Sequence, residues 1–228
     1  MFQACFGLGA RVLPWRRPEC ITGAGSLQRL PELLADAGCK KPMIVAQFRA
    51  EGCDSMVAIG GGSPMDAAKA AAARLARPNR SVGQLKGLLK VRRKIVPFAA
   101  VPTTAGTGSE TTIAAVVTDE THHKYAANDL CLIPRWAILD PTLMVSLPAG
   151  VTAETGLDAL THAVEAYIGR FYNTRETRSL ARQAVAAIFQ YLPTACADGA
   201  EAEANPVYPV PVIFSKEDFI RVARWVMP

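Results

Sequence analysis

A run of glycines between a short apolar segment and an alanine-rich segment constrains the fold of this chain more than any other feature. Residues 56–59 have the apolar character of a buried strand, and residues 67–76 have that of a helix. Between them stand Gly60, Gly61, Gly62, Ser63, Pro64, Met65 and Asp66. Ser63 is a favourable N-cap, Pro64 suits the first helical turn, and Asp66 is placed to close a capping box. The sequence therefore predicts a strand–turn–helix unit of an α/β fold.

The same glycines suggest a ligand. They leave backbone N–H groups uncovered at the positive end of the helix, which is a ready site for a phosphate or diphosphate. The alternative is a tight turn that binds nothing. Because three successive glycines exceed what a turn requires, we favour phosphate binding. The motif is neither G-x-G-x-x-G nor a P-loop, since it lacks the P-loop lysine.

A second loop rich in glycine and hydroxyl groups, residues 102–110, follows the predicted strand 95–101. In open α/β sheets, ligands bind at the carboxyl ends of the strands. The threonine and serine hydroxyls of this loop can bond phosphate or ribose, or they can satisfy only the loop's own backbone. The residues alone leave both interpretations open.

The remaining segments alternate between strand and helix patterns. The periodicity predicts helices at 27–37 and 174–192, and another that begins near Thr152. Strands are predicted at 42–45, 112–118, 122–126 and 137–139, the middle two as a hairpin. Residues 1–20 and 195–203 show no regular pattern.

Two residues of the helix after Thr152 can bind a cation. Asp158 and His162 are four residues apart, which places a carboxylate and an imidazole on one face of a helix. Both groups ligate zinc or ferrous iron. An ion pair across one turn, or a capped core histidine, explains the same spacing, and the spacing alone favours these simpler interpretations.

Composition excludes several classes of function. Half of the 228 residues are hydrophobic, enough for one core and part of a second domain. The net charge is only +5, with no basic cluster interleaved with aromatics, which disfavours nucleic-acid binding. No apolar run is long enough to span a bilayer, and residues 1–10 make a poor secretory signal. The six scattered cysteines indicate reduced thiols, so we expect a cytoplasmic protein without a membrane partner.

Three segments, in this order, resemble the iron-containing (group III) alcohol dehydrogenase family, whose relatives include glycerol dehydrogenase and dehydroquinate synthase. They are residues 58–69, 102–110 and 156–165. The resemblance implies a dehydroquinate synthase-like, nucleotide-binding α/β domain over residues 1–147. A truncated all-helical metal and substrate domain would follow over residues 148–228. The implied activity is an oxidoreductase that transfers hydride between an alcohol or aldehyde and NAD(P). A non-catalytic nucleotide-binding remnant and a metal-assisted lyase are the alternatives.

The resemblance also implies site residues. The cofactor-binding set would be Gly60, Gly61, Gly62, Ser63, Asp66, Thr103, Thr104, Thr107, Lys124 and Leu143. Asp158 and His162 match the first two of four ligands of a divalent metal, iron or alternatively zinc, and are the catalytic candidates. In the family this metal acts as a Lewis acid on the alcohol oxygen.

The chain departs from the family pattern at the metal site. Two later histidines complete that site in the family, whereas no histidine follows His162 here. A second gap lies near residues 46–51, where the family has another β-α unit. We therefore expect an internally shortened protein with impaired activity and weak metal binding. We also expect its helical domain to expose apolar surface, through which the protein would self-associate, for example as a homodimer.

Overall fold

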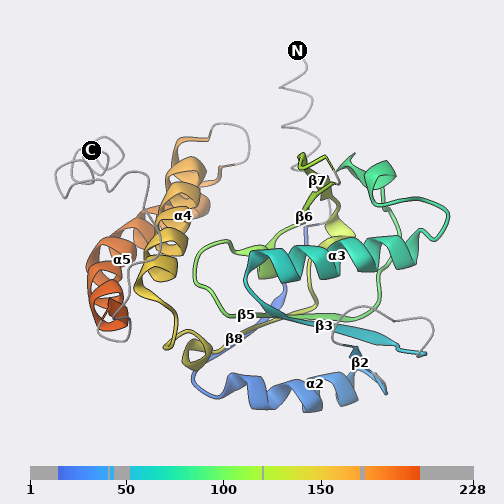
Figure 1. Ribbon diagram of the computed structural model, residues 1–228, viewed down its shortest axis with the longest axis horizontal. Coiled ribbons are helices and arrows are strands. Elements are labelled where there is room, and N and C mark those ends of the chain that lie inside the picture. The colour runs from blue at the N-terminus through green and yellow to red at the C-terminus, as the bar shows by residue number, and fades with distance from the viewer. Residues whose placement is uncertain (1–14, 41, 44–51, 120, 170–172, 201–228) are drawn as a thin grey trace. The chain divides into compact units, whose positions relative to one another are not determined.

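The computed structural model describes residues 15–40, 42–43, 52–119, 121–169 and 173–200. The chain divides into two compact units, one within residues 14–145 and one that includes residues 146–200. The first unit is an α/β structure, and the second is helical (Figure 1). The predicted fold class, an α/β unit followed by a helical unit, is confirmed.

The first unit is built on a five-stranded parallel sheet with the order β1-β8-β5-β3-β2. Its strands are β1 (Glu19–Thr22), β2 (Pro42–Met43), β3 (Ser55–Gly60), β5 (Phe98–Pro102) and β8 (Trp136–Leu139). All five residues of β5 are buried, as are the first four of β3. Such continuous burial is expected of parallel strands that are covered on both faces, and it explains the apolar runs in the sequence.

Helices cover the two faces of this sheet (Figure 1). Helix α3 (Gly62–Ala76) packs its small buried alanines against one face, in a cluster with Met56, Phe98 and Leu132. Helix α2 (Leu30–Asp36), preceded by the 3₁₀ turn η1 (Ser26–Arg29), packs against the other face beside Trp136. The predicted helix 27–37 therefore begins as a 3₁₀ turn, and β1 was missed in a segment predicted to be irregular. Of the predicted strand 42–45, residues 44–45 lie outside the described residues.

A second, three-stranded sheet has the order β4-β7-β6. It consists of β4 (Gly87–Leu88), β6 (Ala114–Thr118) and β7 (Lys124–Asn128). β6 and β7 pair antiparallel, so the predicted hairpin is confirmed. The prediction that His122 and His123 begin the return strand is wrong. His122 has a positive φ of 61°, and the Asp119 carboxylate accepts hydrogen bonds from two N–H groups of this turn, those of Thr121 and His123.

The helical unit contains α4 (Ala149–Ile168) and α5 (Arg175–Ala200). They pack together through a small core of Leu160, Ala163 and Val185. The predicted start of α4 at Thr152 is three residues late, because the helix begins directly after Pro148, whose carbonyl accepts from Thr152 N at 2.9 Å. Within the described chain no helix is both long and apolar enough to cross a membrane.

The end of α5 also differs from the prediction. The helix predicted over residues 174–192 continues through Pro193 to Ala200, although proline disfavours a helix interior. Pro193 itself is exposed. Large apolar side chains of this unit also face solvent: Ile168, Leu180 and Tyr191 are 50%, 54% and 62% exposed.

Candidate functional site

The turn from β3 into α3 carries the predicted phosphate site. Gly60 has a φ of 145°, which favours glycine, and Gly61 is the N-cap. The prediction that Ser63 caps the helix is wrong, because the helix already begins at Gly62 and no side chain bonds its first turn. Ser63 is exposed. The N–H groups of the first turn of a 15-residue helix are therefore left without a side-chain cap.

The loop after β5 packs directly on these glycines. Thr103 N donates to Gly60 O at 3.0 Å. A Cβ atom on Gly61 would lie 3.3 Å from Thr104 Oγ1, and one on Gly62 would lie 2.9 Å from Thr107 Cγ2. The close approach of the threonine loop thus leaves no room for a side chain at Gly62 and little at Gly61. The structure brings the predicted residues Gly60, Gly61, Gly62, Thr103, Thr104 and Thr107 together.

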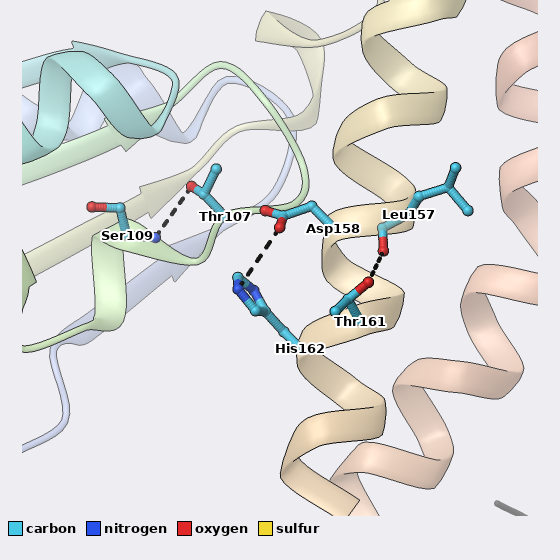
Figure 2. Close-up of polar contacts among 6 residues, drawn as sticks. All are labelled: Thr107, Ser109, Leu157, Asp158, Thr161 and His162. Carbon is cyan, nitrogen blue, oxygen red and sulfur yellow. Dashed lines mark hydrogen bonds and ion pairs between the residues drawn. The ribbon is translucent and has the colours of Figure 1, made fainter. Parts of the chain in front are cut away.

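One hydroxyl at this junction has no partner of its own. Thr104 Oγ1 is buried and makes no hydrogen bond within the described residues. Thr107 Oγ1 accepts from Ser109 N at 3.3 Å (Figure 2). A buried polar atom without a partner is costly unless a ligand or water satisfies it. Helix N–H groups, close glycine backbone and hydroxyls are a donor set that fits a diphosphate. The residues present therefore fit the dinucleotide that the resemblance implied.

A buried ammonium ties α3 to the same loop. The Lys69 side chain has no exposed surface. Its Nζ donates to the carbonyl oxygens of Ser109, Thr112 (3.0 Å) and Ala114 (2.9 Å). It also lies 3.2 Å from Ser109 Oγ and 2.9 Å from Thr112 Oγ1. Ser109 Oγ in turn donates to Asp66 Oδ1 at 2.6 Å. Asp66 therefore belongs to this hydrogen-bond network and does not form the capping box that was predicted.

Burial changes the acid–base properties of this network. Desolvation lowers the pKa of Lys69 from 10.5 to about 8, although the carboxylates of Asp66 and Glu110 oppose the shift. Burial also raises the pKa of Glu110 above its ordinary value of 4.5. Sequence reasoning missed Lys69 as a site residue. The available signal was one ionisable side chain on a helix face that is otherwise alanine, methionine and leucine.

Two predicted cofactor residues lie elsewhere in the first unit. Lys124 is the exposed first residue of β7. Leu143 ends the 3₁₀ turn η5 (Pro141–Leu143) and packs on the hydrophobic cluster beside α2. Within the described chain, no hydrogen bond joins either residue to the β3–α3 junction. Their assignment to the cofactor remains a prediction from the resemblance.

The predicted metal pair lies on α4. Asp158 Oδ1 and His162 Nε2 are 3.8 Å apart, and the two side chains point toward one another from successive turns (Figure 2). Both are about half exposed, at 45% and 52%. Among the described residues no group of three or more His, Cys, Asp or Glu side chains could hold a metal ion. Catalytic zinc sites use three protein ligands, so this pair does not complete a metal centre.

Comparison with known families identifies two matches along the chain. Residues 44–141 match the family described as iron-containing alcohol dehydrogenase. Residues 152–208 match the description Fe-containing alcohol dehydrogenase family, C-terminal. The chain belongs to the iron-containing alcohol dehydrogenase family. The resemblance inferred from residues 58–69, 102–110 and 156–165 is confirmed.

Individual members of the family are similar over about two thirds of this chain. The NAD-dependent methanol dehydrogenase of Bacillus methanolicus is 46% identical over 159 residues, which cover 69% of this chain and 41% of that protein. The 1-propanol dehydrogenase of Citrobacter freundii is 42% identical over 156 residues, covering 68% of this chain and 38% of that protein. The chain thus spans about 40% of the length of these curated relatives.

Solved structures of the family share the fold. The alcohol dehydrogenase from Oenococcus oeni superposes with a TM-score of 0.75 at 29% identity, covering 83% of this chain and 61% of that chain. Sulfoacetaldehyde reductase from Bifidobacterium kashiwanohense, solved in complex with NAD⁺, has a TM-score of 0.72 at 26% identity. That match covers 84% of this chain and 62% of the other.

Proposed function

We propose that this chain binds the diphosphate of a nicotinamide dinucleotide at the N-terminus of α3. The observation that carries the proposal is the junction of Gly61 and Gly62 with the threonine loop, where Thr104 Oγ1 is buried and makes no hydrogen bond to the part of the chain that the structure describes. The uncapped first turn supplies N–H donors and a positive dipole end, and the glycines keep side chains out of the way. Thr103, Thr104 and Thr107 would position the dinucleotide from the opposite side.

The reaction that this binding would serve is hydride transfer between an alcohol or aldehyde and NAD(P). The named relatives act as methanol and 1-propanol dehydrogenases, which supports a small alcohol as substrate. When bound, the nicotinamide supplies the hydride-accepting chemistry. The contribution of the chain itself is to bind and orient the dinucleotide. Because Asp158 and His162 do not complete a metal centre, we derive no step through a metal ion.

A non-catalytic nucleotide-binding protein is the second candidate. It is favoured by a specific observation, the absence of a third metal ligand near Asp158 and His162 within the described residues. In this case the dinucleotide site would be retained while turnover with alcohols is absent or low.

One titration followed by one assay separates the candidates. The fluorescence of NADH and NADPH is measured as the protein is added, and saturable enhancement is expected. Absorbance at the NADH band is then followed with NAD⁺ or NADP⁺ as the hydride acceptor, with methanol, ethanol or 1-propanol, and with ferrous, zinc or manganese ions. Binding with turnover supports the dehydrogenase, and binding without turnover supports the non-catalytic protein. If neither dinucleotide binds, the proposed function is wrong.

A further inference from the structure

We propose that Lys69 is a positioning residue of the dinucleotide site, because its buried ammonium holds the threonine loop against the N-terminus of α3. The inference rests on the proposed function, because it concerns the affinity of that same site. Lys69 itself lies on the third turn of α3, and its side chain has no exposed surface. It therefore acts through the loop and not by contact with the dinucleotide.

The hydrogen-bond count explains why an ammonium is needed. Three backbone carbonyls, those of Ser109, Thr112 and Ala114, converge on Lys69 Nζ. A protonated amine has three N–H donors, which is one for each carbonyl. A neutral amine has two, so one buried carbonyl would lose its donor. An apolar side chain at this position would take the ammonium donor from all three carbonyls. Ser109 O would keep Thr112 N at 3.3 Å, and the Thr112 hydroxyl lies 3.4 Å from the carbonyl oxygens of Ser109 and Ala114, so only long hydrogen bonds would remain there.

The residues whose carbonyls bind Lys69 lie close in sequence to Thr104 and Thr107, which pack on the glycines. Ser109 is two residues from Thr107, and its own N–H donates to Thr107 Oγ1 at 3.3 Å. Ser109 Oγ is also bonded to Asp66 Oδ1 on α3. The segment is thus fixed at one end by β5 and at the other by Lys69. Loss of the Lys69 end frees Thr107 to move away from Gly62, where the two residues are now in close contact.

The charge on Lys69 also gives the inference a measurable signature. The ionisable groups that interact with it are Asp66 on α3 and Glu110 on the 3₁₀ turn η3 (Ser109–Thr111). With a pKa of about 8, Lys69 loses a proton at a pH where NADH is stable and its diphosphate does not titrate. Dinucleotide affinity should therefore fall as the pH rises through about 8. The effect of Lys69 on the free energy of unfolding runs the other way. Its pKa is lower in the folded chain than the 10.5 of the unfolded chain, so its deprotonation makes the fold more stable as the pH rises above about 8.

The test compares the wild type with four variants. NADH dissociation constants are measured by fluorescence from pH 6.5 to 9.5, and hydrogen exchange of the amides of residues 103–112 is measured without ligand. Lys69→Met removes the donors, and Lys69→Arg retains a charge that does not titrate. Arg74→Met is the matched control, because Arg74 is an exposed cation on the same helix. Thr112→Val removes one hydroxyl, which accepts from Lys69 Nζ and lies 3.4 Å from the carbonyl oxygens of Ser109 and Ala114, and this variant serves if Lys69→Met does not fold.

We expect Lys69→Met to weaken NADH binding by about tenfold or more at pH 7 and to accelerate loop exchange, since hydrogen bonds to charged groups are worth this much. Thr112→Val should weaken binding less, Arg74→Met should leave it unchanged, and Lys69→Arg should bind NADH with a flat pH profile. If the wild-type affinity is the same at pH 7 and 9.5, and the Lys69 and Thr112 variants bind like the wild type, the inference is wrong while dinucleotide binding stands. Failure of the wild type to bind NADH or NADPH would overturn both.

Discussion

Replacing Gly62 by alanine tests the close packing between the start of α3 and the threonine loop. The new Cβ atom would lie 2.9 Å from Thr107 Cγ2 and 3.2 Å from both Thr107 Cβ and Thr107 Oγ1. Every heavy atom of the Thr107 side chain is therefore too close. Rotation about χ1 cannot relieve the contact, because the Cβ atom itself is involved. The loop backbone has to shift.

Two opposing effects set the change in stability that Gly62→Ala causes. Alanine is preferred over glycine within a helix by about 1 kcal/mol, and by less in the first turn. Overpacking a tight contact costs about 1–3 kcal/mol. Since the contact distance is well below the ordinary range, we expect overpacking to win and to leave a net loss of about 1 kcal/mol. For a chain of this size, that loss lowers Tm by roughly 2–4 °C.

The same shift should reduce NADH affinity by about tenfold, because misplacement of a binding group by about 1 Å is costly. Thermal unfolding and NADH fluorescence are measured on Gly62→Ala and on the control Gly150→Ala. Gly150 lies in the first turn of α4, is exposed, and has no atom within 4 Å of its added Cβ. The control should be as stable as the wild type or more so. If the two variants behave alike in both measurements, the packing argument is refuted.

Two further predictions concern metal and acid. Prolonged dialysis should leave well below one iron or zinc ion per chain by elemental analysis, because Asp158 and His162 offer only two ligands; a retained stoichiometric ion would show otherwise. Asp140→Asn should lower Tm at pH 7, because the Asp140 carboxylate accepts from Gly25 N, Leu27 N and the Thr142 hydroxyl. The Thr142 hydrogen bond and these amides hold the pKa of Asp140 below 3.8, so its stabilisation is present above that pH and lost at lower pH. Thermal unfolding from pH 7 to 2.5 should therefore be less pH-dependent in the variant, and equal slopes would contradict the assignment.

Local sequence patterns were sufficient to predict strands and turns where a residue type has a single physical role. The apolar runs of β3, β5 and β8 predicted strands of an α/β fold, and the structure pairs them parallel and largely buried. The spacing of the glycines predicted the strand–turn–helix unit, although not its first residue. Ser63 has the chemistry of an N-cap, but the N-cap is Gly61 and the helix begins two residues earlier than predicted, at Gly62, where Thr107 packs closely.

The amino-acid sequence by itself determined the family of this protein, the alternation of its main strands and helices apart from β1 and β4, and the residue types of its glycine and threonine loops. Only the tertiary structure decided that these loops meet, that Thr104 Oγ1 has no hydrogen-bond partner among the described residues, and that Lys69 is buried among three carbonyls. These properties join residues about 35–45 positions apart, such as Lys69 and Thr112. No local periodicity encodes such a contact, because it depends on how β3 and β5 pair and on how α3 packs across them.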